Sequence, residues 1–175
     1  IINVSNDESA AADLAELNPY NEVPTLVDRD LLLHNAGVIN DYLDERYPHP
    51  PLMPVDPVSR ARLRLVHHRV IRDWYPLAAE IENATGKKAD KPRQQLKESI
   101  LAANDLFKHS DFMLGDELSL VDCTLAPLFW RLPVYGIDLG QPGSSIQAYI
   151  QRLISRRSFK TSLTRAEREM VLNAT

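Results

Sequence analysis

The sequence predicts an α+β protein with two domains, a small β-α-β-β-α unit followed by an all-helical domain. Runs typical of strands occur near the start of the chain, and no convincing strand follows them. Apolar residues at helical spacing dominate the second part of the chain. Four prolines lie between the two patterns, which favours a stiff connection. We therefore place the domains at residues 1–47 and 57–175, with a proline-rich linker at residues 48–56.

The first domain is predicted from alternating strand and helix patterns. "IINV" is a β-branched run typical of a strand, and its abrupt start without Met leads us to expect that residues precede Ile1. "ESAAADLAEL" has high helix propensity, and "NPYNE" is a turn by its Asn-Pro pair. Two strands around a two-residue turn come next, and a helix follows them. These three elements are expected at residues 23–28, 31–34 and 36–47.

The second domain is predicted to be helical to its end. A long helix over residues 56–84 has Pro57 in its first turn and carries one apolar stripe. Pro76 within this helix predicts a kink, and "TGKKADKP" after it is a polar break. "CTLAPLFWRL" is apolar on nearly every side, which is typical of a central helix. The helices after the break are expected at residues 93–107, 123–132, 144–159 and 164–170.

Two helix starts in this domain carry a capping-box pattern. Ser119 stands three residues before Asp122, at the start of the predicted central helix. Thr164 stands three residues before Glu167 in the same way. In such a box each side chain accepts a hydrogen bond from a backbone N–H group that has no helical partner. We therefore assign Ser119 and Asp122 a structural role.

Composition excludes several functional classes. No run approaches the roughly 20 apolar residues of a membrane helix, and no signal-peptide pattern is present. We therefore expect a cytoplasmic protein without a membrane partner. Cys123 is the only cysteine, and its apolar neighbours predict a buried, inert thiol. One cysteine and five scattered histidines give no metal-ligand spacing, so no metal site is predicted.

The net charge of −4 is distributed unevenly along the chain. Residues 1–45 carry ten acidic residues and one basic residue, whereas residues 46–175 carry fourteen acidic and nineteen basic residues. Five arginines gather between residues 60 and 72, without the interleaved aromatic residues that stack on bases. Two interpretations of these arginines stay open: they form a solvated helix face, or they bind an acidic surface of a partner. Direct sequence-specific DNA binding is not expected.

Three features together resemble the glutathione-transferase superfamily. "VPTLV" supplies Val23-Pro24, where the superfamily has a cis-proline just before a strand. "SLVD" followed by "CTLAP" matches its capping box on the core helix. The order of elements matches a thioredoxin-like domain joined to a helical bundle, across essentially the whole chain. The resemblance implies a glutathione-transferase-like fold in which the first strand and helix of the thioredoxin-like domain are absent from this chain.

Longer strings resemble one branch of this superfamily, the bacterial stringent starvation protein A family. They are spread over both domains: "NPYNEVPTLVDRDL", "YLDERYPHPPLMPVDPV", "DWYPL", "LSLVDCTLAPLFWRLP" and "SLTRAEREM". The resemblance implies a non-enzymatic regulator without a cofactor, which binds the RNA polymerase holoenzyme near its sigma subunit in stationary phase and stress. Such regulators are usually homodimers, and dimerisation with a related paralogue is a further option. The resemblance also implies a Pro-His-Pro surface motif, which matches Pro48, His49 and Pro50.

Two alternatives to this interpretation stay open. The prolines could serve only to route the chain across the domain junction. The chain could also be a glutathione-dependent transferase or peroxidase, with Val23, Pro24 and Asn35 as remnants of the glutathione site. A transferase needs an acidic or amide residue followed by Ser at the start of the helix after the hairpin, to hold the γ-glutamyl group. Asn35-Ala36 keeps the amide and lacks the hydroxyl, so we expect glutathione binding and catalysis to be lost.

Overall fold

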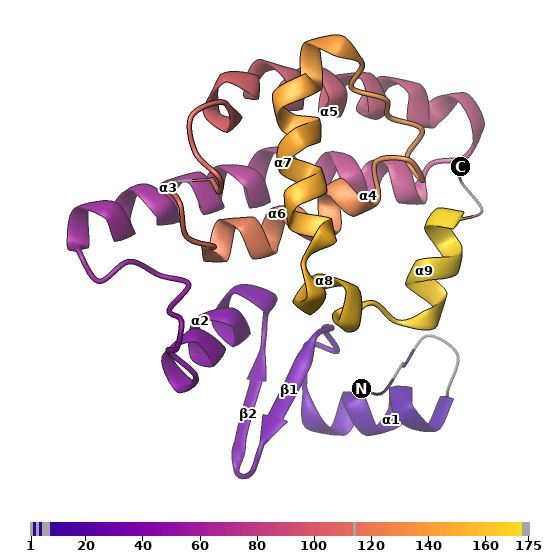
Figure 1. The fold of residues 1–175 in the computed structure, drawn as a ribbon. Coiled ribbons are helices and arrows are strands. Elements are labelled where there is room, and N and C mark those ends of the chain that lie inside the picture. Colours follow the sequence, from indigo (N-terminus) through magenta and orange to yellow (C-terminus); the bar gives the residue numbers. More distant parts are fainter. Residues whose placement is uncertain (1, 3, 5–7, 114, 173–175) are drawn as a thin grey trace. The chain divides into compact units, whose positions relative to one another are not determined.

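The chain divides into two units, Ile1–Leu52 and Met53–Thr175, here called unit 1 and unit 2. The division falls inside the proline-rich stretch of the sequence. The computed structural model describes residues 2, 4, 8–113 and 115–172. Its elements follow the predicted order, with the two strands in unit 1 and helices alone in unit 2 (Figure 1).

Unit 1 is built around an antiparallel β-hairpin. α1 (Glu8–Leu17) precedes the hairpin, β1 (Thr25–Asp28) pairs with β2 (Leu31–His34), and α2 (Ala36–Arg46) follows. In the two-residue turn Arg29 has a φ of 55°, a left-handed conformation that tight turns use. The predicted helices, strands and turn of this segment are confirmed.

The strand expected at residues 1–4 falls largely outside the described residues. Of that stretch only Ile2 and Val4 are described, and neither belongs to a strand. The sheet of the described residues therefore consists of β1 and β2.

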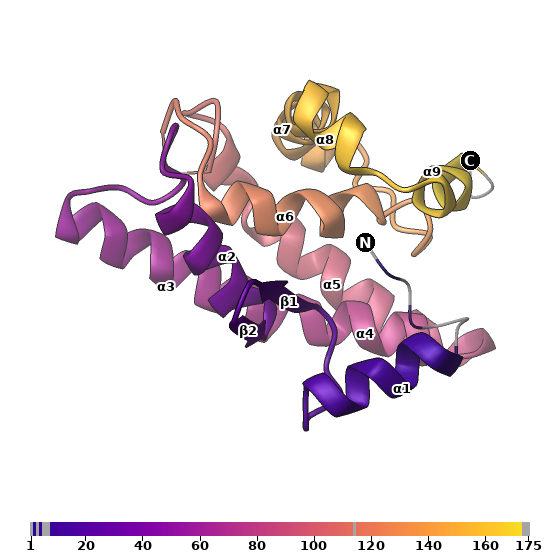
Figure 2. The same cartoon turned by 90° about the horizontal axis from the view of Figure 1, so that it is seen from below.

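The regular elements described in unit 2 are all helices, apart from an isolated bridge between Phe112 and Gly115. Its elements in chain order are α3 (Pro57–Asp73), α4 (Tyr75–Asn83), η2 (Gly86–Ala89), α5 (Asp90–Ala102), η3 (Asn104–Phe107), α6 (Leu120–Trp130), η4 (Gln141–Gly143), α7 (Ser144–Ser155), α8 (Arg157–Ser162) and α9 (Arg165–Leu172). α6 lies between α7 on one side and the layer of α3, α4 and α5 on the other (Figure 2).

α6 is the core helix of unit 2, as its apolar pattern predicts. Val121 and Leu125 on this helix are 0% exposed. The Phe129 ring packs against three other rings, with centroids 6.0 Å from Trp74 and 6.1 Å from both Phe107 and Tyr149. These contacts join the α3–α4 junction, η3 and α7 to α6, and each aromatic pair adds about 0.5–1.5 kcal/mol to the effect of burial.

The long predicted helix is interrupted where Pro76 predicts a kink. α3 ends at Asp73 and α4 begins at Tyr75, so Pro76 lies in the first turn of a new helix. In that turn its missing N–H removes no helical hydrogen bond. Trp74 at the junction is buried and donates its indole N–H to Ser99 Oγ at 2.8 Å. The predicted kinked helix is thus two helices, which are interrupted at Trp74, two residues before Pro76.

Several predicted helix boundaries are wrong, among them the start of the central helix, which is Leu120 and not residue 123. α5 starts at Asp90, inside the predicted polar break, because Pro92 lies in the first helical turn, where proline is tolerated. α5 also ends early, since residues 104–107 form a 3-10 turn. The helix predicted over residues 144–159 is two helices, α7 and α8, because Arg156 between them has a non-helical ψ of 138°.

Candidate functional site

The proline-rich stretch after α2 forms a continuous exposed surface. Every residue from 45 to 51 is exposed. We call residues 47–52 the Pro-His-Pro loop. Its centre holds the three predicted contact residues, Pro48, His49 and Pro50, all of them exposed as a partner would require.

Two hydrogen bonds order the Pro-His-Pro loop, one within the loop and one to α2. The backbone N–H of His49 donates to the Tyr47 carbonyl at 2.9 Å, and the His49–Pro50 peptide bond is cis. The backbone N–H of Leu52 donates to Asp44 Oδ1 at 2.6 Å. Asp44 belongs to α2, so its carboxylate ties the far end of the loop to the helix from which the loop starts.

The side chains of the loop are available to a partner. Within the described part of the chain, no hydrogen bond, ion pair or ring contact involves the His49 imidazole. A neutral imidazole offers one donor and one acceptor. Just before it in the chain, the Arg46 guanidinium lies over the Tyr47 ring, 5.6 Å from the centroid, and Tyr47 is 65% exposed. One short segment therefore presents an imidazole, proline rings and a phenol.

The residues of the predicted glutathione-site remnant lie at the other end of α2. The Val23–Pro24 peptide bond is cis, as predicted. Thr25 pairs with His34 in the hairpin, so the preceding Pro24 and the following Asn35 lie at the same end of the two strands. The fold thus brings together the three residues that the sequence singles out for this site.

The Asn35 side chain occupies two of the backbone amide groups at the start of α2. It is the N-cap of α2, with a φ of 73°. Its Oδ1 accepts the N–H of Gly37 at 2.9 Å and the N–H of Val38 at 3.4 Å. Ala36, the first helical residue, has no hydroxyl to offer. Because anions bind to free N–H groups at a helix N-terminus, the Asn35 cap competes with a γ-glutamyl carboxylate.

Asn18 organises the segment that leads to Pro24, a role that the Asn-Pro turn signal does not reveal. The residue is 0% exposed. Its Nδ2 donates to the Glu22 carbonyl at 3.2 Å and to Thr25 Oγ1 at 3.0 Å. Its Oδ1 accepts the backbone N–H of Tyr20 at 3.0 Å. One buried amide therefore fixes the loop from the end of α1 to the start of β1.

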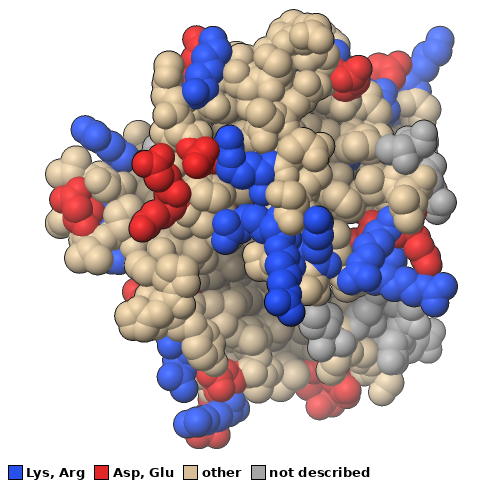
Figure 3. All heavy atoms as spheres, in the orientation of Figure 1, with Lys and Arg blue, Asp and Glu red and all other residues tan. Residues whose placement is uncertain are grey.

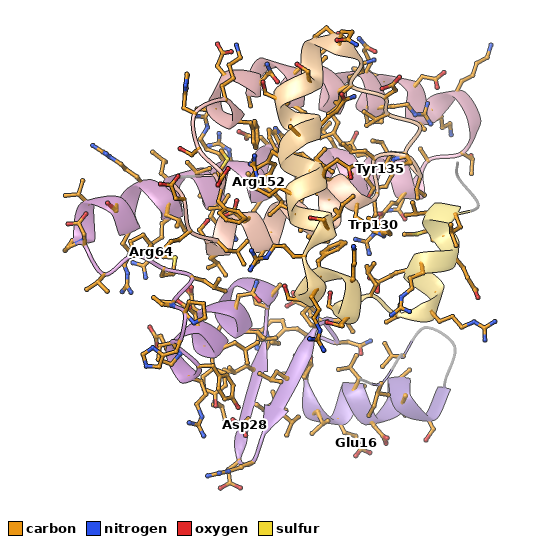
Figure 4. The ribbon with its side chains drawn as sticks, viewed as in Figure 1. Glu16, Asp28, Arg64, Trp130, Tyr135 and Arg152 are labelled. Atoms are coloured by element: carbon orange, nitrogen blue, oxygen red, sulfur yellow. The ribbon has the colours of Figure 1, made fainter. Side chains whose placement is uncertain are left out.

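A further hydrogen bond fixes α2 to the hairpin. The Tyr42 hydroxyl donates to Asp28 Oδ2 at 2.5 Å, and Asp28 lies near the tip of the hairpin (Figure 4). This hydrogen bond raises the pKa of Tyr42 above its ordinary value of 10.0, and desolvation adds to the effect. Tyr42 thus stays protonated at neutral pH and keeps its role as donor.

The capping box predicted at the start of α6 is present and buried. Asp122 Oδ2 accepts the backbone N–H of Ser119 at 2.7 Å and its hydroxyl at 2.6 Å. Asp122 Oδ1 accepts the N–H of Met113 at 2.8 Å and the hydroxyl of Tyr149 at 2.5 Å. Burial and the neighbouring carboxylate raise the pKa of Tyr149, so this hydroxyl stays a donor. Asp122 therefore joins α6 to the preceding loop and to α7.

The environment of Cys123 differs from its prediction. The residue is exposed, although Asp122 and Thr124 beside it are buried. Most of α6 is covered by neighbouring helices, but Cys123 lines an open hollow of about 330 Å³, together with Trp130, Phe159 and other residues. The prediction of a buried thiol is wrong.

Two other kinds of site are absent from the described part of the chain. No group of three or more His, Cys, Asp and Glu side chains there is placed to hold a metal ion. None of the described helices combines the length and the apolar character needed to cross a membrane.

Known proteins resemble this chain in sequence and in fold. Family models of the glutathione S-transferase N-terminal and C-terminal domains match residues 1–51 and 61–157. A stringent starvation protein A homolog of Pasteurella multocida (strain Pm70) is 47% identical over 161 residues, which cover 91% of this chain and 76% of the relative. The homolog of the same name from Haemophilus influenzae is 49% identical over 155 residues, which cover 88% and 73%. The solved structure of BphK, a bacterial GST, matches with a TM-score of 0.78 at 26% identity, over 89% of this chain and 78% of that chain.

Proposed function

Because this chain belongs to the stringent starvation protein A family, within the glutathione-transferase superfamily, we propose that it is a non-catalytic regulator of the bacterial stress response. It acts in the cytoplasm as a homodimer that binds the RNA polymerase holoenzyme near the sigma subunit. Pro48, His49 and Pro50 form the contact with the polymerase. The exposed Pro-His-Pro loop is the observation that carries this proposal.

The covalent and local structure of the loop supports a docking role. Proline fixes φ near −65°, so Pro48 and Pro50 limit the conformations open to the free segment. The hydrogen bond from Leu52 to Asp44 restrains the segment further. A segment that is already ordered loses little conformational entropy on binding, and this raises affinity without any additional contact. The His49 imidazole adds a donor and an acceptor that a polymerase surface can recognise.

The proposed contact is tested with the variant Pro48→Ala/His49→Ala/Pro50→Ala. We expect its affinity for purified polymerase holoenzyme to fall by at least about tenfold, which corresponds to about 1.4 kcal/mol. The physical reason is the loss of the imidazole contacts and of the ordering that proline imposes. Titration of the full chain against immobilised holoenzyme, followed by pull-down, measures the change.

His109→Ala is the matched control, because it removes an exposed imidazole from unit 2. This variant is expected to bind the holoenzyme as tightly as the parent chain. Equal binding by the triple variant and the parent would defeat the site assignment. No binding by the parent chain would defeat the proposed function itself.

Glutathione-dependent transfer is the second candidate function. The transferase fold favours it, and so does the placement of Pro24 and Asn35 at the same end of the two strands. The Asn35 cap and the missing hydroxyl at Ala36 oppose it. Loss of a single hydrogen bond to a charged group costs about 1.5–3 kcal/mol, which alone weakens binding by roughly tenfold or more.

We expect isothermal titration calorimetry with millimolar glutathione to give no saturable heat for the parent chain. The reason is that the start of α2 offers no hydroxyl to the γ-glutamyl carboxylate, and Asn35 Oδ1 already accepts the N–H groups of Gly37 and Val38. Gly-Gly at equal concentration corrects for non-specific heat. A saturable signal that only glutathione gives would favour the transferase over the regulator.

A further inference from the structure

A basic surface over α7, α8 and α9 plays no part in the proposed polymerase contact. Residues 152–168 contain six basic residues and a single acidic one, Glu167. Figure 3 shows Lys and Arg side chains gathered over these helices on the face in view. We define the α7–α9 basic surface as Arg152, Arg156, Arg157, Lys160, Arg165 and Arg168.

Two of these six charges are neutralised by nearby carboxylates. Arg152 on α7 (Figure 4) pairs with Asp111 at 3.3 Å, and Arg165 pairs with Glu169 at 2.7 Å. The other four form no ion pair within the described residues. They are Arg156, Arg157, Lys160 and Arg168. The surface therefore keeps a surplus of positive charge, in a unit that has eighteen basic and fourteen acidic residues.

The accessible centre of this surface lies on α8. Arg157, Ser158 and Lys160 are exposed, and their side chains make no hydrogen bond or ion pair within the described part of the chain. Arg157 and Lys160 are three residues apart, so they lie on the same side of the helix. The aromatic residue of α8, Phe159, packs against Trp130 with ring centroids 5.5 Å apart. α8 therefore offers cations and a hydroxyl to a ligand, without an exposed aromatic ring.

This chemistry fits phosphate groups better than a protein surface. The centre of a protein interface is rich in aromatic and apolar anchors, which α8 does not present. Single-stranded nucleic acid requires aromatic rings for base stacking, which are equally lacking on this helix. Arg, Lys and Ser side chains are the usual contacts to the backbone of a duplex, and they carry no sequence information there.

We propose that the α7–α9 basic surface binds the sugar-phosphate backbone of duplex DNA without reading its sequence. The proposal does not rest on the polymerase contact, since it concerns other residues in the other unit. It agrees with the sequence-based expectation that this chain does not read DNA sequence directly. The two contacts would complement each other, because a regulator that is bound to polymerase lies beside promoter DNA.

Salt dependence of DNA binding tests this proposal. With four phosphate contacts, the plot of log affinity against log salt concentration has a slope of about −3.6, so affinity falls roughly a hundredfold between about 50 and 200 mM salt. Arg157→Ala/Lys160→Ala removes two contacts, so we expect a slope of about −1.8 and a fall of roughly tenfold over the same range. Fluorescence anisotropy of a labelled duplex of arbitrary sequence, titrated with the full chain, gives both slopes.

Lys87→Ala/Lys88→Ala is the matched control, because it removes two exposed charges from η2. Its slope is expected to equal that of the parent chain. The proposal is overturned if the parent chain does not bind the duplex at low salt, or if both double variants share the parent slope. It is also overturned if Arg157→Ala/Lys160→Ala loses polymerase binding but keeps the parent's DNA binding, since the partner would then be an acidic protein. The Pro-His-Pro triple variant is expected to bind DNA normally, so the two proposals can fail separately.

Discussion

Replacement of Asp122 by alanine is expected to lower the free energy of unfolding of unit 2 by about 4 kcal/mol. The Asp122 side chain is 0% exposed and accepts four hydrogen bonds, two from Ser119 and one each from Met113 and Tyr149. Alanine leaves two backbone N–H groups and two hydroxyls without an acceptor in the core. A buried polar group without a partner costs about 1–3 kcal/mol, and partial relaxation lowers the sum.

Urea unfolding followed by tryptophan fluorescence measures this loss. Both tryptophans of the chain, Trp74 and Trp130, belong to unit 2, so the signal reports this unit. The urea midpoint should fall at an unchanged slope of stability against urea concentration. Asp116→Ala is the control, because Asp116 is exposed in the loop before α6, and its effect should stay within about 0.5 kcal/mol.

Tyr149→Phe tests the same network in a variant that keeps the fold. It removes one of the four donors and leaves the Asp122 carboxylate with its other three. We expect a loss of about 1–2 kcal/mol in the same unfolding experiment. Losses below about 0.5 kcal/mol for Tyr149→Phe and below about 1 kcal/mol for Asp122→Ala would show that this network contributes little to the stability of unit 2.

The Asp122 site shows which polar contacts a sequence reveals. The bond between Ser119 and Asp122 follows a fixed spacing of three residues, so the capping-box pattern predicts it. Met113 lies nine residues before Asp122 and Tyr149 lies 27 residues after it. These two contacts depend on how the loop and α7 pack against α6. No local spacing encodes them, and sequence reasoning therefore missed half of the network.

Local turn and proline patterns in the sequence predict some elements of the fold correctly and others wrongly. The hairpin follows from local turn chemistry and is confirmed, and proline chemistry indicates the interruption of the long helix near Pro76. The polar residues before Pro92 predict a break that ends at this proline, although proline at a helix start loses no hydrogen bond. The apolar neighbours of Cys123 indicate that α6 is buried, but they do not indicate which part of its circumference stays uncovered.

The two ends of α2 differ in how far the sequence predicts them. Exposure of the Pro-His-Pro loop follows from its composition, whereas its anchor at Asp44 joins groups eight residues apart and was missed. At the other end, the resemblance to transferases implies that Asn35 is a remnant of a ligand-binding site. Asn is also one of the most favoured N-cap residues, and that signal predicts the hydrogen bonds it makes to Gly37 and Val38.

Replacement of Asn18 by alanine is expected to destabilise unit 1 by about 2 kcal/mol. The substitution removes three hydrogen bonds, those with Tyr20, Glu22 and Thr25, from a residue that is 0% exposed. Among the described residues of unit 1, the buried apolar core consists of Ala10, Leu14 and Ile39. Because a small core gives a small free energy of unfolding, the loss of one buried hydrogen-bond network removes a large fraction of it.

Hydrogen exchange with mass spectrometry locates this effect, because unit 1 contains no tryptophan to report its unfolding. Backbone amides of residues 18–28 should exchange roughly thirtyfold faster in Asn18→Ala, the ratio that corresponds to about 2 kcal/mol. Asn40→Ala is the control, because its side chain makes no hydrogen bond within the described part of α2, and alanine favours the helix. Unchanged exchange in Asn18→Ala would contradict the prediction. The loop before Pro24 would then be held by the backbone bonds from Asn18 to Leu14 and from Asn21 to Asn18, which alanine preserves.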